Sequence, residues 1–177
     1  MNIYKIRQNL EQMNKPVFTT NEITRISRLK KSAAIVSIKR MIDQHLLYRV
    51  AKGFYSISDD PFLYATYIIQ NSYISFNTSL YLHQVIDQIP TKIFVAVPTR
   101  IKKQVPGVVF ITMPKQGFQG YTTMQYKGYN IWVADIEKAL ADLIYKYGRY
   151  TALNIKPNTK KINTFLQKLE MKKGCVQ

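Results

Sequence analysis

Cysteine and long apolar runs are scarce in this sequence, and each scarcity excludes a class of protein. The 177 residues include one cysteine, Cys175, which cannot form a disulfide or a structural zinc site within the monomer. No segment reaches the roughly 18 uninterrupted apolar residues of a membrane-spanning helix, and the first residues lack the pattern of a signal peptide. We therefore expect a protein of the reducing cytoplasm with no membrane partner.

Acidic residues are also scarce, since 10 Asp and Glu face 26 Lys and Arg and leave a formal net charge of +16. Such a field attracts phosphate polyanions, and binding that depends on it weakens as salt is added. Nucleic acid is the first partner to consider, although anionic membranes and ribosomes attract the same charge and lysine also aids solubility. Apolar residues make up 46% of the chain, which excludes general disorder and predicts a buried core.

Recognisable catalytic sets are missing as well. Gly117, Gly120 and Gly128 are too scattered for a phosphate-binding loop. His83 could serve as a general base, but neither it nor His45 belongs to a recognisable Ser-His-Asp or Cys-His set. We expect no catalytic residues, no cofactor and no bound metal, and so not an enzyme.

Three successive segments at the start of the chain have apolar residues at helical spacing. The first spans 2–13 with Asn2 as its N-cap, and the second begins where Thr19 stands three residues before Glu22, the spacing of a capping box. The third helix is expected at about 33–45, with Ser32 as its cap. Its predicted apolar face consists of Ala34, Ile35, Ile38, Ile42 and Leu46.

Two strand-like runs follow, at 47–50 and 54–57, joined by the short loop Ala51-Lys52-Gly53. Three helices and a two-stranded ribbon within about 60 residues is the order of a winged helix-turn-helix, in which the third helix enters the major groove and the wing touches flanking backbone. The sequence therefore predicts a DNA-binding module at 1–58.

The polar face of the third helix carries the short and cationic side chains that duplex recognition needs. Arg40 is the candidate for base readout, because its planar fork can bond two acceptors of guanine, and Arg49 and Lys52 would anchor the wing. Two alternatives remain, an ordinary solvated helix face and a protein-docking module. The candidate DNA-binding residues are Lys30, Lys31, Ser32, Ser37, Lys39, Arg40, Arg49 and Lys52.

A domain boundary is expected at Asp59-Asp60-Pro61, where two acids precede a residue unsuited to a helix interior. After this boundary, helical and strand-like segments alternate, which predicts a small α/β domain with a mixed sheet at 61–177. The fold class of the whole chain is therefore expected to be α+β. Helices are expected at 62–70, 77–85, 135–147 and 160–171, a short extended entry at 72–75, and strands at 93–97, 108–111 and 129–133.

Asp135, Glu137 and Asp142 suggest a competing function, because carboxylates beside a lysine can hold a divalent metal for phosphodiester chemistry. The runner-up is thus a metal-dependent, nucleic-acid-processing enzyme. Helical spacing favours a structural role, since Lys138 can pair with Asp142 across one turn, while Asp135 and Glu137 lie in a first turn where acids are stabilised. A weaker alternative is stacking of unpaired bases on four aromatic residues, Tyr121, Tyr126, Tyr129 and Trp132.

Four segments of the chain form a recognisable set: FTTNEI at 18–23, LLYRVAKGFY at 46–55, YISFNTSLYLH at 73–83 through QIP at 88–90, and ADIEKALADL at 134–143. On these segments, about residues 15–145 resemble the AbiEi-type antitoxins, in which a winged helix precedes a second domain. Gln84 stands where that family usually has glycine, and Ile136 where it usually has proline, so the chain looks like a divergent member.

This resemblance implies a repressor of its own operon and an antitoxin of a type IV system, which opposes a nucleotidyltransferase-like toxin with or without contacting it. The expected partner is double-stranded operator DNA. We expect it to be bound by a homodimer on a palindromic or repeated site. The basic second domain could extend the DNA footprint or meet another acidic surface, and the sequence does not choose between these.

Overall fold

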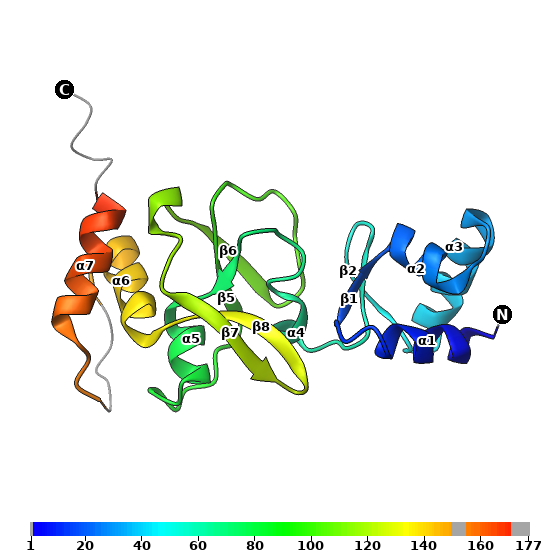
Figure 1. Cartoon of the computed structure of the whole chain (residues 1–177), viewed down its shortest axis with the longest axis horizontal. Coiled ribbons are helices and arrows are strands. Elements are labelled where there is room, and N and C mark those ends of the chain that lie inside the picture. The colour runs from blue at the N-terminus through cyan, green and yellow to red at the C-terminus, as the bar shows by residue number, and fades with distance from the viewer. Residues whose placement is uncertain (1, 150–154, 171–177) are drawn as a thin grey trace, which may run out of the picture.

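The computed structural model describes residues 2–149 and 155–170 of an elongated molecule (Figure 1). Three helices and a three-stranded sheet lie at the N-terminal end, and a five-stranded sheet occupies the middle. The last two described helices cover the opposite end. The described chain is therefore α+β, as expected, and Cys175 lies outside the described residues.

The first three helices are α1 (Ile3–Glu11), α2 (Thr20–Ser27) and α3 (Lys31–Asp43). Asn2 caps α1 by accepting a hydrogen bond from the backbone N–H of Tyr4 at 3.1 Å. Thr19 and Glu22 form the predicted capping box at the start of α2. The inward faces of the helices share one core with the first sheet, made of Ile6, Leu10, Phe18, Ile23, Ile38, Met41, Leu47 and Ile57.

Two details predicted for α3 are wrong. The helix begins at Lys31, so Ser32 lies in its first turn and is not the cap, a position taken by Lys30 without a side-chain hydrogen bond. Ile35 is 51% exposed, whereas Met41 is buried in the core. The buried stripe follows the spacing i, i+4, i+7 from Ala34, which turns the neighbouring Ile35 about 100° away from the core.

The first sheet is antiparallel, with strand order β1-β3-β2, and contains the predicted hairpin. Its strands are β1 (Val17–Thr19), β2 (Tyr48–Ala51) and β3 (Phe54–Ser56). Gly53 closes the β2–β3 turn with a φ of 78°, a left-handed conformation that glycine adopts without steric cost.

A short helix, α4 (Pro61–Tyr64), follows at the predicted boundary, with Asp60 as its N-cap. The expected helix at 62–70 is thus mostly wrong, because the chain turns after Tyr64. Thr66, Ile68 and Ile69 are β-branched residues that a helix disfavours. The hydroxyl of Ser72 donates to the backbone carbonyl of Ile69 at 2.7 Å and closes this turn.

The second sheet is mixed, with strand order β6-β5-β4-β8-β7. The pairs β5–β6 and β4–β8 are parallel, and β4–β5 and β7–β8 are antiparallel. The edge strand β7 was not predicted from the sequence. The strands are β4 (Tyr73–Ile74), β5 (Ile93–Val97), β6 (Val108–Thr112), β7 (Tyr121–Tyr126) and β8 (Tyr129–Ala134).

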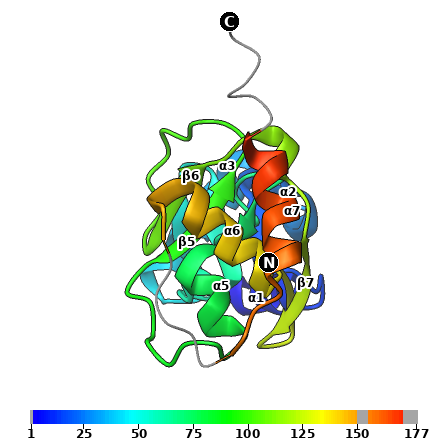
Figure 2. The same ribbon diagram turned by 90° about the vertical axis from the view of Figure 1, so that its left-hand side faces the viewer.

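The remaining helices pack at the far end of this sheet. They are α5 (Phe76–Leu82), the 3-10 turn η1 (Lys115–Gly117), α6 (Ile136–Tyr147) and α7 (Thr159–Glu170). Helices α6 and α7 lie side by side and α5 contacts α6, as Figure 2 shows from that end. No helix among the described residues is long and apolar enough to cross a membrane.

An apolar cluster joins the hairpin to the second half of the chain. It combines two kinds of residue that are far apart in sequence, those of the first sheet and those that follow the predicted boundary. The members are Val17, Val50 and Ala51 from the first sheet, and Tyr64, Ile68 and Val105 from the rest. Because each of them is at most 8% exposed, this contact excludes water from both surfaces.

Candidate nucleic-acid interface

The face of α3 that points away from its core is the candidate interface. Its positions are solvent-exposed except for Ser37, which is half-buried. The exposed candidates on and before the helix are Lys30, Lys31, Ser32, Lys39 and Arg40. The structure therefore places all six predicted residues of this segment on the accessible side or at its margin.

Two apolar residues share this exposed face. Ile35 and Val36 are 51% and 50% exposed, although burying an apolar side chain of this kind lowers the free energy of the protein. On a helix that contacts a duplex, such side chains can lie against the methyl group of thymine. The sequence predicts both Ala34 and Ile35 on the core face, whereas in the structure Ala34 is buried and Ile35 is exposed.

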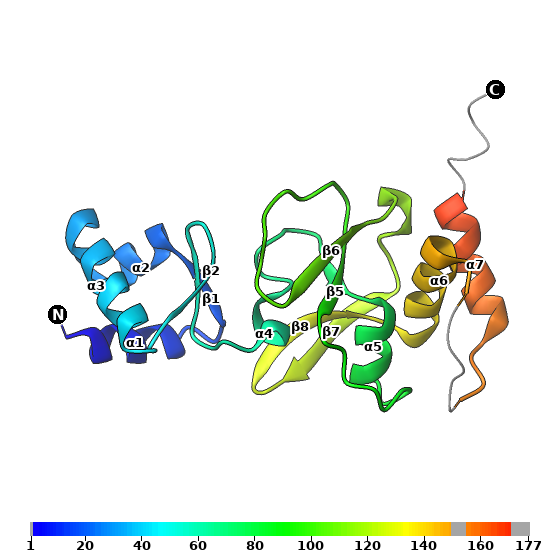
Figure 3. The same ribbon diagram turned by 180° about the vertical axis from the view of Figure 1, so that it is seen from behind.

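The hairpin holds the other two predicted cations. Arg49 lies on β2 opposite Tyr55 of β3, and Lys52 lies in the turn beside Gly53; both cations are exposed. The ladder shifts register between Arg49 and Ala51, a bulge that increases the local twist of the strand. The tip of the hairpin and the N-terminal end of α3 both reach the upper edge of the molecule in Figures 1 and 3.

The charges of these side chains are not neutralised by the protein. Within residues 2–149 and 155–170, no ion pair or side-chain hydrogen bond is made by six candidate cations: Lys30, Lys31, Lys39, Arg40, Arg49 and Lys52. By contrast, Arg7 pairs with Glu11 at 2.9 Å, and Lys15 pairs with Glu22. The uncompensated cations are thus available to an anionic partner.

A loop of the second half adds cations that sequence reasoning did not assign to the interface. The loop of residues 98–107 joins β5 to β6, and it carries Arg100 and Lys102 exposed to solvent. Lys103 lies over the ring of Phe54 on the hairpin, with Nζ 4.8 Å from the ring centroid. This loop lies along the upper side of the molecule in Figure 1.

Two further contacts hold this loop against the first sheet. Val105 is 6% exposed and packs with Val50 and Ala51 of the hairpin. The hydroxyl of Tyr64 donates to the backbone carbonyl of Pro106 at 2.8 Å. The run Ile-Lys-Lys at 101–103 signals charge in the sequence, but nothing local to it indicates that it lies beside a hairpin about 50 residues earlier.

The carboxylates proposed as a metal site are not assembled into one. Asp142 is fully buried, pairs with Lys138, and accepts hydrogen bonds from Ser75 at 2.7 Å and Tyr73 at 3.1 Å. Asp135 and Glu137 instead face Lys161 of α7, at 3.6 and 3.1 Å. In the described part of the chain, no three His, Cys, Asp or Glu side chains are grouped to hold a metal ion.

Burial governs the electrostatics of the Lys138–Asp142 pair. Removal from water raises the pKa of Asp142 and lowers the pKa of Lys138, while their mutual attraction opposes both shifts. The predicted pairing across one helical turn is confirmed. The pair lies in the core between Tyr73 of β4 and Phe165 of α7, where it holds elements together.

The two histidines have ordinary surroundings. The Nε2 of His83 lies 2.9 Å from the backbone carbonyl of Ala134, so this ring links α5 to the end of β8. His45 is exposed and follows α3 with a φ of 55°. Neither is placed beside a hydroxyl or thiol nucleophile by a hydrogen bond in the described residues.

Comparison with protein-family models and with curated proteins found no match to this chain.

Proposed function

We propose that the chain is a DNA-binding transcriptional regulator whose first three helices and hairpin form a winged helix-turn-helix. The observation that carries this proposal is the set of exposed, unpaired cations at the start of α3 and on its accessible side, Lys30, Lys31, Lys39 and Arg40. An α-helix fits the major groove of B-form DNA, and cations beside it can bind the flanking phosphates. A merely solvated face would not require a hairpin with further unpaired cations at the same edge of the molecule.

Different side chains would have different tasks on the duplex. Arg40 reads a guanine by donating two hydrogen bonds, and Lys30, Lys31 and Lys39 bind phosphates as point charges. The exposed Ile35 and Val36 support this geometry, because contact with base methyl groups would remove them from water. Arg49 and Lys52 bind backbone phosphates beside the groove that α3 occupies.

The test is the double substitution Lys39→Ala and Arg40→Ala, with fluorescence anisotropy on the duplex upstream of the protein's own gene. Loss of a bidentate base contact costs about 1–3 kcal/mol, so we expect affinity for that duplex to fall by at least about fivefold. The matched control is Lys146→Ala with Lys160→Ala, which removes two exposed cations from α6 and α7. Equal affinity of the two double variants, with unchanged thermal unfolding, would contradict the proposal.

The resemblance to AbiEi-type antitoxins supports a narrower proposal, that the bound DNA is the operator of the chain's own operon. The two departures from that family fall at backbone positions suited to the family residues. Gln84 follows α5 with a φ of 58°, where glycine is favoured, and Ile136 is the first residue of α6, where proline is favoured. The fold can therefore accommodate either pattern.

This narrower proposal has its own test in cells. A reporter under the protein's own promoter is expected to be repressed by the wild-type chain and released by the Lys39→Ala and Arg40→Ala variant. Co-expression with the adjacent gene tests the antitoxin role, because the chain is expected to restore growth that a nucleotidyltransferase-like toxin inhibits. Repression without growth rescue would reduce the proposal to a DNA-binding regulator.

A further inference from the structure

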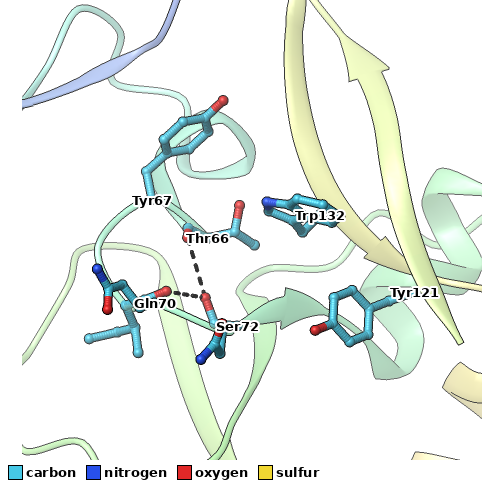
Figure 4. Close-up of a pocket in the computed structure, with 8 residues that line it drawn as sticks. Thr66, Tyr67, Gln70, Ser72, Tyr121 and Trp132 are labelled. Atoms are coloured by element: carbon cyan, nitrogen blue, oxygen red, sulfur yellow. Dashed lines mark hydrogen bonds between the residues drawn. The ribbon is translucent and has the colours of Figure 1, made fainter. Parts of the chain in front are cut away.

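A cavity of about 470 Å³ lies in the second half of the chain, away from the residues assigned to DNA. It opens between the turn of residues 65–72, which joins α4 to β4, and the strands β7 and β8 (Figure 4). Its volume falls in the range of about 300–1,000 Å³ that holds small ligands. The turn and the strands come from distant parts of the chain, so only the folded protein contains this site.

Aromatic rings and amide groups line the cavity. Tyr67, Tyr121 and Trp132 contribute the rings, and Gln70 and Asn71 contribute the amides. Trp132 is 45% exposed, and its ring lies edge-on to that of Tyr121, with the ring centroids 5.9 Å apart. The cavity thus offers an unoccupied π-face beside groups that both donate and accept hydrogen bonds.

The lining has no formal charge, which distinguishes it from the rest of this protein. Among the described residues that surround the cavity, none is Lys, Arg, Asp, Glu or His. A phosphate or carboxylate ligand would find no counter-ion here, and a purely aliphatic ligand would leave the amides without partners. The lining therefore favours an uncharged ligand with an aromatic plane and polar edges.

The wall of the cavity contains a hydroxyl whose hydrogen-bonding capacity is unused. Thr66 is 6% exposed, and its Oγ1 has no hydrogen-bond partner among the described residues. A buried polar atom without a partner costs about 1–3 kcal/mol. Such an atom is rare in folded proteins and is accounted for when a ligand or a water bonds to it.

We infer that this cavity binds a nucleobase, which stacks on Trp132 while the amides of Gln70 and Asn71 bond its polar edge. Side-chain amides form paired hydrogen bonds with adenine, and stacking on an aromatic residue contributes about 1–3 kcal/mol per base. The base belongs to a free nucleoside or to an unpaired position of a nucleic-acid strand. Neither case requires the proposed role of α3.

Trp132 makes the inference directly testable, because it is the one tryptophan of the chain. Its intrinsic fluorescence is followed while adenosine, guanosine, cytidine or uridine is added to the full-length protein. We expect saturable quenching by at least one of them or by an oligonucleotide duplex with a single unpaired base. A fully paired duplex of the same sequence is expected to quench Trp132 less. Quenching by free nucleosides identifies a free ligand, and quenching by the unpaired base alone identifies a strand.

The matched variant is Gln70→Ala with Asn71→Gly, in which glycine preserves the left-handed backbone of Asn71 at a φ of 53°. This double variant is expected to bind the quenching ligand with an affinity lower by about tenfold or more, whereas Gln167→Ala on α7 leaves the affinity unchanged. Thr66→Val is expected to weaken binding without lowering the thermal stability of the free protein. The inference is overturned if nothing quenches saturably, or if the double variant binds as the wild type does.

Repeating the titration in the Lys39→Ala and Arg40→Ala background separates the two proposals. Nucleoside binding is expected to survive there whether or not α3 binds DNA. Loss of nucleoside binding in that background, with the fold intact, would contradict a site confined to the cavity.

Discussion

Gln84 has a left-handed backbone conformation, with a φ of 58°, directly after the last turn of α5. A residue with a Cβ atom adopts this conformation at a cost of roughly 1–2 kcal/mol, which glycine avoids. The carbonyls at the end of α5 depend on it, because the backbone N–H of Val85 donates to the carbonyl of Leu80 at 2.9 Å. The turn therefore constrains the backbone more strongly than it constrains the side chain.

Gln84→Gly is expected to raise the free energy of unfolding by about 0.5–1 kcal/mol, because the native φ is then reached without strain. Urea denaturation of the variant and the wild type measures the difference. Gln88→Gly serves as the control, since Gln88 is exposed and has no positive φ. An unchanged or lowered stability in Gln84→Gly would contradict the strain argument.

The carboxyl group of Glu22 makes the stability of the start of α2 depend on pH. Partial burial alone would raise the pKa of its carboxyl group, but hydrogen bonds from Lys15 and Thr19 outweigh burial and hold the pKa below the ordinary value of 4.5. A carboxyl group with a lowered pKa in the folded state stabilises the fold above its unfolded pKa. That contribution disappears as the pH falls through the folded pKa.

We therefore expect Glu22→Gln to be less stable than the wild type at pH 7 and to approach it as the pH falls below 4.5. Thermal unfolding from pH 7 to pH 3 measures this convergence. Glu11→Gln is the comparison, because Glu11 forms only an exposed pair with Arg7. A constant difference between Glu22→Gln and wild type at every pH would refute the linkage.

At the scale of elements, the loop of residues 98–107 extends the cationic edge formed by α3 and the hairpin. Each phosphate contact contributes about −0.9 to the slope of log affinity against log salt for duplex DNA. Arg100→Ala with Lys102→Ala is expected to weaken DNA binding and to make that slope shallower by up to about 2. Affinity measured at four salt concentrations gives the slope.

The same measurement on Lys146→Ala with Lys160→Ala controls for loss of net charge alone. A smaller change in slope is expected there, since those residues lie on helices at the far end of the molecule. If both double variants changed the slope equally, the loop would have no local role.

Elements formed by neighbouring residues were the ones that the sequence could predict. The capping box of Thr19 and Glu22, the β2–β3 hairpin and the long apolar stripe of α6 all depend on spacings of a few residues. The strand β7 was missed because its Tyr-Thr-Thr-Met-Gln-Tyr pattern lies at a sheet edge, half in solvent, and lacks a continuous apolar run.

The parts of the candidate sites that were missed depend on long-range contacts. Lys103 reaches Phe54, and the turn holding Gln70 meets Trp132, across about 50 and 60 residues of chain. Neither pairing leaves a periodic signal in the sequence. The exposure of Ile35 was missed for a different reason, because Ala34 and Ile35 are adjacent apolar residues whose side chains point about 100° apart, and spacing alone does not show which lies nearer the centre of the buried face.

At the scale of the whole molecule, the Lys138–Asp142 pair lies where β4, α5, α6 and α7 meet. Removing one partner of a buried ion pair leaves an uncompensated charge and costs about 3–5 kcal/mol. We therefore expect Lys138→Met to be strongly destabilised in urea denaturation. Lys138→Met with Asp142→Asn is expected to recover much of the loss, because asparagine is neutral and still accepts from Ser75 and Tyr73.

Asp142→Asn alone completes this cycle and measures the coupling between the two residues. A strong coupling is expected, and additive effects of the single substitutions would mean that the charges do not interact. If Lys138 and Asp142 were catalytic, their substitution would remove activity without lowering stability. Because both side chains are buried, we expect the substitutions to lower stability instead.

In the apolar cluster between the hairpin and the second half, each half covers apolar side chains of the other and keeps them from water. Severing the chain near Asp59 would leave Val17 and Val50 uncovered on one fragment, and Tyr64 and Val105 uncovered on the other. Each fragment would then expose a hydrophobic patch to water. Despite its positive charge, we expect each fragment to self-associate through that patch. Aggregation of a truncated protein would therefore follow from the loss of this apolar contact and would not show that the remaining half is unable to fold.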